Sequence, residues 1–342
     1  MFRRWVWLWL AGAPLVLAQS SVAPKDSQIK VEVNVVNVPV TVTDAAGRFI
    51  TDLDRKDFKV SEDGKSVEVR YFSRDPAQPI QVGFILDASN SARLYFKTYQ
   101  EAITDLAWTL MPGTNKNRGF LATYHTEPDF LVKPTGDAEL IVEKIRKLKP
   151  GGGAALLETV YQSCNKFFTV RGQPNEPKRV LVLIGDGHDN SSKVSIEQAL
   201  EAAQRSQVVI YAISTVAYGF TNEEENNLVR LAEETGGLVV RPLQKIHTKV
   251  SGYLSTPSDE GNYAYKVGTG QYAAELAAKI FGSLTEVAGN ITHQYVLGYV
   301  SPTPFTEAKF RSIKVEVDLK DAAIKVRARK GYYPFEAPPA SK

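Results

Sequence analysis

The stretch that decides the fold is Ile80-Gln81-Val82-Gly83-Phe84-Ile85-Leu86-Asp87-Ala88-Ser89-Asn90-Ser91. Its first seven residues are mostly apolar, which is typical of a parallel strand buried on both faces. Polar residues follow at once, and apolar residues then recur at helical spacing from Tyr95 to Leu110. This order predicts a strand over residues 80–86, a polar loop and a helix, which is the repeating unit of an α/β fold.

The same alternation continues along the middle of the chain. Strands that alternate with helices predict a doubly wound, Rossmann-like parallel sheet over residues 80–284. Residues 243–271 are rich in Ser, Gly, Thr and Pro, and we expect them to form an insertion loop. Further strands are predicted over 120–124, 130–132 (a short edge strand), 179–184, 208–213 and 238–240, and helices over 138–148, 154–168, 196–205, 223–234 and 272–287.

Both flanks of this unit have β character. Residues 31–42 alternate in two opposed phases with Pro39 near the break, which favours a bulge and an edge position. Asp63-Gly64 is a strong turn signal and predicts a β-hairpin. We expect residues 19–79 and 285–342 to form one β-sandwich-like domain into which the α/β unit is inserted. The hairpin arms are predicted over 58–62 and 66–72, and the C-terminal strands over 293–300, 310–319 and 323–329.

The N-terminus has the features of a signal peptide. Arg3 and Arg4 precede an apolar run that reaches about residue 17, and Ala18 ends it. This pattern predicts a signal peptide over residues 1–18, cleavage after Ala18, and export to the periplasm or the outside. The alternative is an anchor that stays attached, although the run is short for a membrane span. After cleavage we expect no membrane span.

Charge and cysteine content exclude some classes of partner and of stabilising bond. Removal of Arg3 and Arg4 lowers the formal net charge from +3 to +1, so bulk charge gives no reason to expect a nucleic-acid partner. Cys164 is the only cysteine, so no internal disulfide can form. It lies in an apolar helical pattern, and we expect it to be buried and unreactive.

Oxygen-bearing side chains follow two of the predicted strands. Asp87, Ser89 and Ser91 come after the first strand, and Asp186 follows the strand over 179–184. Ligands of such sheets bind at the carboxyl ends of the strands, and Mg²⁺ prefers oxygen ligands. The four side chains therefore predict a cation site. The simpler alternatives are that Ser91 caps a helix and that Asp186-Gly187 forms a turn.

These motifs resemble a known family. Asp87-x-Ser89-x-Ser91 resembles the metal-ion-dependent adhesion site of von Willebrand factor A-type (VWA) domains, and residues 152–156 and 182–190 resemble two later segments of that family. The flanks resemble those of VWA-related proteins of Acidobacteria. The flanking motifs are Asp57-Phe58, Asp63-Gly64, Tyr295-x-Leu297-Gly298-Tyr299 and Arg329-Lys330-Gly331-Tyr332-Tyr333.

The resemblance implies a role for each site residue. Ser89 and Ser91 would bind Mg²⁺ or Mn²⁺ directly. Asp87 and Asp186 would bind it directly or through water, beside a loop that contains Gly153. An acidic residue of a protein ligand would take an open position on the metal. One position departs from the family pattern, because Ala154 stands where the family has a Thr ligand, and this predicts a lower metal affinity.

The resemblance implies a binding or adhesion protein and no enzyme. No Gly-x-Ser-x-Gly, His-Glu-x-x-His or phosphate-binding Gly-Lys-Ser/Thr motif is present. A phosphatase with Asp87 as its nucleophile is the main enzymatic alternative, but it needs a second Asp where this chain has Ser89, so the general acid is missing. A scaffold that binds protein without metal is the other alternative, and Ala154 favours it.

Overall fold

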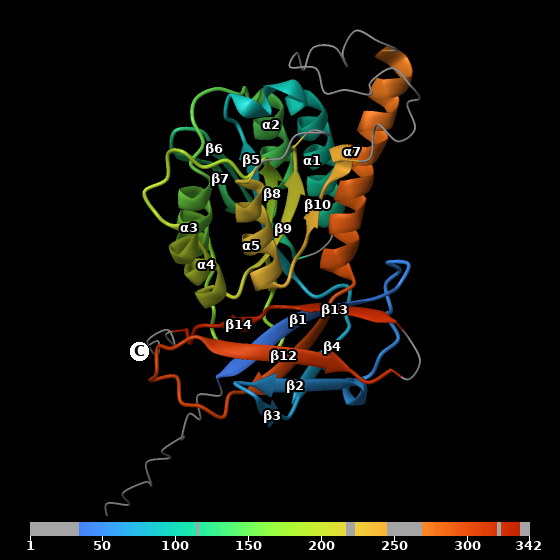
Figure 1. Cartoon of the computed structure of the whole chain (residues 1–342), viewed down its shortest axis with the longest axis vertical. Coiled ribbons are helices and arrows are strands. Elements are labelled where there is room, and N and C mark those ends of the chain that lie inside the picture. The colour runs from blue at the N-terminus through green and yellow to red at the C-terminus, as the bar shows by residue number, and fades with distance from the viewer. Residues whose placement is uncertain (1–33, 114–115, 217–222, 245–268, 320–322, 336–342) are drawn as a thin grey trace, which may run out of the picture. The chain divides into compact units, whose positions relative to one another are not determined.

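A six-stranded sheet forms the centre of the α/β part (Figure 1). Its strand order is β10-β9-β8-β5-β6-β7. All neighbours pair in parallel except β7, which runs antiparallel to β6 at one edge. The predicted α/β class is thereby confirmed, including the edge strand. The strands are Ile80–Asp87 (β5), Arg118–Tyr124 (β6), Pro128–Thr135 (β7), Lys178–Gly185 (β8), Val209–Ser214 (β9) and Val239–Val240 (β10).

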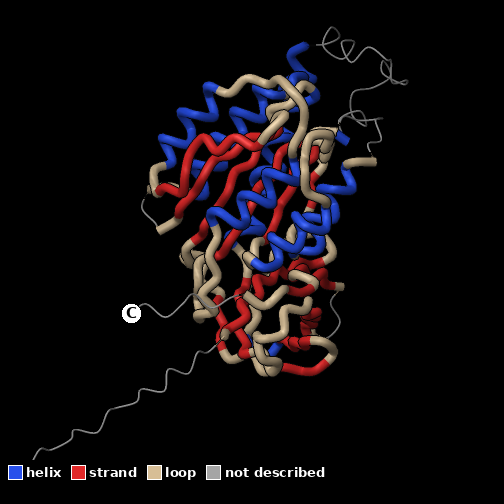
Figure 2. The backbone as a smooth tube through the Cα atoms, turned by 90° about the vertical axis from the view of Figure 1, so that its left-hand side faces the viewer, coloured by secondary structure: helices blue, strands red, loops and turns tan. Residues whose placement is uncertain are grey.

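Helices cover both faces of this sheet (Figure 2). Successive side chains of a strand point to opposite faces, so Phe84 and Leu86 pack with one helical layer and Ile85 with the other. Cys164 is fully buried in the second layer, as predicted. The first layer holds α1 (Phe96–Leu110), α2 (Ala138–Lys147) and α7 (Thr269–Thr292), and the second holds α3 (Leu156–Phe167), α4 (Ile196–Arg205) and α5 (Glu225–Thr235).

The segments on either side of this unit form two four-stranded antiparallel sheets, with the orders β13-β1-β11-β4 and β14-β12-β2-β3. Strand β1 pairs with β11 and β13, and β2 pairs with β12, so strands from both ends of the chain share each sheet. Their apolar faces enclose one common core. The strands are Val35–Asp44 (β1), Phe58–Glu62 (β2), Lys65–Val67 (β3), Tyr71–Ser73 (β4), Tyr295–Val300 (β11), Arg311–Val317 (β12), Ile324–Ala328 (β13) and Gly331–Tyr332 (β14).

Two expectations for the N-terminal flank were wrong in detail. Strand β1 is continuous and lies between two neighbours, so Pro39 is not on an edge strand. Proline is tolerated there because pairing with β13 begins only at Val40, and Pro39 has a partner on one side alone. The Asp63-Gly64 turn does close a hairpin, but its second arm is split. Strand β3 ends at Val67, and β4 pairs with β11 in the other sheet.

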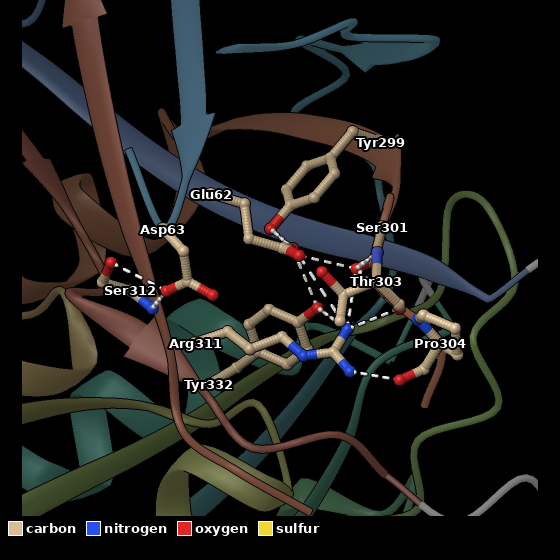
Figure 3. A network of polar contacts seen from close by, with 9 residues as sticks. All are labelled: Glu62, Asp63, Tyr299, Ser301, Thr303, Pro304, Arg311, Ser312 and Tyr332. Carbon is tan, nitrogen blue, oxygen red and sulfur yellow. Dashed lines mark hydrogen bonds and ion pairs between the residues drawn. The ribbon is translucent and has the colours of Figure 1, made fainter. Parts of the chain in front are cut away.

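A polar network is buried in this antiparallel part (Figure 3). The carboxylate of Glu62 accepts hydrogen bonds from the hydroxyls of Tyr299 (2.7 Å), Ser301 (2.6 Å) and Tyr332 (2.9 Å). The guanidinium of Arg311 lies 3.8 Å from the same carboxylate and is 3 % exposed. A buried ion pair is stable only when its remaining donors and acceptors are also satisfied, and here both partners are fully engaged.

The structure is a computed structural model that describes residues 34–113, 116–216, 223–244, 269–319 and 323–335. The predicted signal peptide and nearly all of the predicted insertion loop lie outside these ranges. Residues Val33–Lys342 belong to one compact unit. Within the described ranges, no helix has both the length and the apolar composition needed to cross a bilayer.

Candidate functional site

Asp87 is the last residue of β5, and its side chain is held by the loop that follows. Its Oδ1 accepts a hydrogen bond from the amide of Ser89 at 2.8 Å. The hydroxyls of Ser89 and Ser91 lie 2.9 Å apart. The short 3-10 helix η2 (Ser91–Leu94) begins here with Asn90, not Ser91, at the N-cap position. Helix capping therefore does not account for Ser91.

Asp186 follows β8, the parallel neighbour of β5, so the two aspartates end adjacent strands. The Oδ1 of Asp186 accepts a hydrogen bond from the amide of His188 at 2.9 Å. This is the turn that the simpler interpretation predicted. The two carboxylates are close enough for the charge of Asp186 to raise the pKa of Asp87. The structure thus brings the predicted carboxylates and hydroxyls together at the carboxyl ends of the two central strands β5 and β8.

The carboxyl group of Asp87 is electrostatically strained. It is 3 % exposed, and burial, which disfavours the charged form, raises its pKa to about 6. Hydrogen bonds from Ser89 oppose this rise, and the charge of Asp186 adds to it. Asp87 Oδ2 is buried and makes no hydrogen bond of standard geometry with the described residues, although the hydroxyl of Tyr124 is close enough to stabilise the carboxylate. A buried carboxylate, a half-buried one and two serine hydroxyls fit a divalent cation in both charge and donor chemistry.

A third loop, which contains Gly153 and Ala154, closes one side of the site. The amide of Ala154 donates to Asn190 Oδ1 (2.9 Å), and its carbonyl accepts from the amides of Asn190 (2.9 Å) and Ser191 (3.0 Å). A β-carbon on Gly153 would lie 2.6 Å from the hydroxyl oxygen of Ser191, so a larger residue there would require the Ser191 side chain to move. The loop also bonds to the β5 loop, through Gly152.

Ala154 supplies no oxygen to this site. Its side chain is fully buried and belongs to the same apolar core as Leu156 and Val160 of α3. The residue that the family resemblance aligns with a Thr ligand is thus a methyl group packed into the core. Any cation must take its ligands from the two aspartates, the two serines, water or a bound partner.

Two site residues were missed by sequence reasoning. Tyr124 ends β6, and its buried hydroxyl lies close enough to the Asp87 carboxylate to interact with it, although not in standard hydrogen-bond geometry. Asp189 accepts hydrogen bonds from the amide of Leu157 (2.7 Å) and the hydroxyl of Ser192 (2.6 Å), which fixes the start of α3. The strand-end rule that identified Asp87 and Asp186 points to Tyr124 as well, because it is the last residue of the next strand.

His188 lies beside the aspartates but faces another partner. Its Nδ1 contacts the carboxylate of Glu224, and this hydrogen bond raises the pKa of His188. No three His, Cys, Asp or Glu side chains cluster as metal ligands anywhere in the described ranges. A cation at this edge would therefore depend on the serine hydroxyls.

Comparison with known proteins agrees with this architecture. Residues 81–245 match the von Willebrand factor type A domain. The fold is similar to an aerotolerance-related membrane protein from Bacteroides fragilis, with 16 % identity, a TM-score of 0.39, and coverage of 47 % of this chain and 90 % of that one. It is also similar to BatB, a conserved hypothetical protein from Bacteroides thetaiotaomicron, with 14 % identity, a TM-score of 0.39, and coverage of 62 % and 98 %.

A third similar structure is proximal thread matrix protein 1 from the mussel byssus, whose metal-ion-dependent adhesion motif is occupied by zinc. The identity is 20 %, the TM-score is 0.42, and the match covers 52 % of this chain and 45 % of that one, less than half its length. No curated protein sequence matches the chain. The family assignment rests on the domain match together with the helix-covered, mostly parallel sheet: residues 81–245 form a von Willebrand factor type A domain.

Proposed function

We propose that this chain is an exported protein that binds an acidic protein ligand through a divalent cation at the edge of its VWA domain. Asp87, Asp186, Ser89 and Ser91 would hold Mg²⁺ or Mn²⁺, and a carboxylate of the ligand would complete its coordination. VWA domains commonly mediate protein binding, which supports this class of function. The observation that carries the proposal is the buried carboxylate of Asp87, which lies beside a second carboxylate and has no cationic partner among the described residues.

The cation would supply the positive charge that the site lacks. Two neighbouring carboxylates repel each other, and burial increases the cost of keeping Asp87 ionised. A bound cation removes both penalties and leaves coordination positions for water or for an acidic side chain. Because Ala154 offers no oxygen, we expect the affinity to be lower than in a site with the family's full ligand set.

A metal-independent interaction domain is the second candidate, and the burial of the Ala154 methyl in the core favours it. The two candidates differ in one observable. A cation that binds only the folded chain raises its melting temperature, and at 100 times its dissociation constant it adds ~2.7 kcal/mol to the free energy of unfolding. Melting curves with Mn²⁺ and with a chelator therefore separate them.

We propose no catalytic role. An Asp-nucleophile phosphatase would need a general acid two residues after Asp87, where Ser89 stands.

Strands from both flanks share one sheet, because β1 pairs with β11 and β13. This pairing supports a division of the chain in which a VWA-like unit over residues 80–284 is inserted between flanks 19–79 and 285–342. The flanking motifs around Asp63, Tyr299 and Tyr332 support a place among the VWA-related proteins of Acidobacteria.

The partner is best sought in the organism that exports the chain. A pull-down with the full chain, in Mn²⁺ and again in chelator, tests the metal-dependent proposal. A partner released by chelator and lost in Asp87→Ala supports it. A partner that stays bound in both Mn²⁺ and chelator would contradict the metal-dependent proposal and support the metal-independent candidate.

A further inference from the structure

A second polar cluster lies at the opposite end of the strands of the six-stranded sheet, where the central strand β8 begins. Lys178 and Arg179 are the first two residues of β8, and Arg329 follows β13. All three cations are buried, with 3 %, 5 % and 3 % of their surface exposed. They line a cavity of about 10 Å³ together with Gln207, Asn37 and Glu176, and the carboxylate of Glu176 is already paired with Arg179. A space of this size holds one particle as large as a water molecule or a small ion.

Positive charge exceeds negative charge in this cluster. Arg179 pairs with buried Glu176, whose carboxylate also accepts two backbone amides. Lys178 Nζ donates to the carbonyl of Ile291 at 2.9 Å, and its opposing charge comes from exposed Asp75. Burial lowers the pKa of Lys178 to about 8. One buried carboxylate therefore serves three buried cations.

Within the described ranges, Arg329 is the one of these three cations for which no carboxylate supplies a counter-charge. Its Nη2 donates to the carbonyl of Gln207 at 3.1 Å. Its Nε and Nη1 are buried without a hydrogen-bond partner among the described residues. Burial lowers the pKa of Arg329 to about 10, and its charge in turn lowers the pKa of Arg179. The contrast with Arg311 is direct, because Arg311 is equally buried but has the carboxylate of Glu62.

Gln207 adds a neutral donor at the same place. It precedes β9 in a left-handed backbone conformation (φ 53°) and is 2 % exposed. Neither its amide nitrogen nor its amide oxygen has a partner in the described part of the chain. Rotation of this amide can present an N–H group to the cavity, beside the free N–H groups of Arg329.

We propose that this cavity is a structural binding site for one chloride ion, held by the free N–H groups of Arg329 and Gln207. An anion accepts hydrogen bonds from these donors and also supplies the missing negative charge, whereas a water molecule supplies no charge. Phosphate and sulfate exceed the size of the cavity. This site lies at the opposite end of the strands from Asp87, so it does not depend on the proposed cation site.

The first test is thermal unfolding of the full chain as sodium gluconate is replaced by sodium chloride at constant ionic strength. Above the dissociation constant, each tenfold increase in chloride should raise Tm by about 2–4 °C. Sulfate should not substitute for chloride. A Tm that does not change with chloride would overturn the proposal.

Matched variants separate the site from general salt effects. Arg329→Met should abolish the chloride dependence of Tm. Lys330→Met removes the same charge from the exposed neighbouring residue and should leave the dependence unchanged. An equal chloride dependence in both variants contradicts the assignment.

A direct test needs no variant and remains decisive if Arg329→Met does not fold. Crystals of the full chain grown in sodium bromide should show an anomalous peak within hydrogen-bond distance of Arg329 Nε or Nη1 and of the Gln207 amide. A water molecule there, without anomalous signal, would establish a hydrated cavity and rule out the anion site.

Discussion

The hydroxyl of Tyr124 lies in the space that a β-carbon on Gly185 would need, and the β-carbon of Asp87 would be 3.1 Å from the same point. These three residues end adjacent strands in the order β6, β5 and β8. The tyrosine ring therefore reaches across the Asp87 position toward Gly185.

The first prediction concerns this contact. Gly185→Ala should lower the free energy of unfolding by about 1–3 kcal/mol, because the added methyl group overlaps the Tyr124 hydroxyl. Tyr124→Phe removes a buried hydroxyl that interacts with the Asp87 carboxylate and should cost about 1 kcal/mol. The double variant should recover much of the loss, since the ring carbon Cζ would be 3.3 Å from the new β-carbon. Urea unfolding of all four proteins measures the coupling, and strictly additive effects would refute this packing.

The second prediction follows from the pKa of Asp87, which is raised from 3.8 to about 6 in the folded chain. The folded state then binds the proton more tightly than the unfolded state, so stability should fall as pH rises from about 4 to about 6 and stay low at pH 7. Two pKa units correspond to up to about 3 kcal/mol. In metal-free buffer at pH 7, Asp87→Asn should therefore stabilise the chain by up to this amount.

The control for this experiment is Asp105→Asn, which changes an exposed carboxylate on α1. It should leave the difference in stability between pH 4 and pH 7 as it is in the wild type, whereas Asp87→Asn should reduce it. Denaturant unfolding across this pH range is the measurement. An Asp87→Asn variant less stable than the wild type at pH 7 would show that the carboxylate is not strained.

The third prediction concerns the network of Figure 3. Glu62→Gln leaves the buried guanidinium of Arg311 without its counter-charge and should lower the free energy of unfolding by about 3–5 kcal/mol. Lys59→Met breaks the ion pair between Lys59 and Asp318, whose side chains are 66 % and 59 % exposed, and should change stability little because solvent screens the pair. Equal costs in chemical unfolding would mean that the network does not stabilise the antiparallel part.

The sequence predicted the α/β part well because its signals are local. A continuous apolar strand such as Ile80–Asp87 and the capped helix Ile196–Arg205 are recognisable within a few residues. The flanks were predicted as β structure, but the position of Pro39 and the split after Val67 were not. Both depend on which distant strand lies alongside, and a local pattern does not contain that information.

The candidate site was predictable to a similar degree. The aspartates and serines were found because they follow strand ends, and their proximity is a consequence of the parallel sheet. The role of Tyr124 was not foreseen, because its side chain reaches across the intervening strand β5 to Gly185 on β8. The buried state of the Ala154 methyl likewise arises from the packing of α3 against the sheet.

The fourth prediction concerns the missing ligand. Ala154→Thr adds a hydroxyl at the family's ligand position and should tighten Mn²⁺ binding about ten- to a hundredfold, from a contact of ~1–3 kcal/mol. Ala155→Thr adds the same hydroxyl one residue later, at another buried position, and should not tighten binding. Manganese titrations of both variants measure the difference. Equal affinities would remove Ala154 as the cause of weak binding.

The central claim is that the edge of the sheet at Asp87 binds a divalent cation, and isothermal titration of the full chain with Mn²⁺ tests it most directly. The account predicts weak binding at one site in the wild type, tighter binding in Ala154→Thr, and none in Asp87→Ala. The absence of binding heat in both the wild type and Ala154→Thr would contradict it and leave a VWA domain that binds its partner without metal.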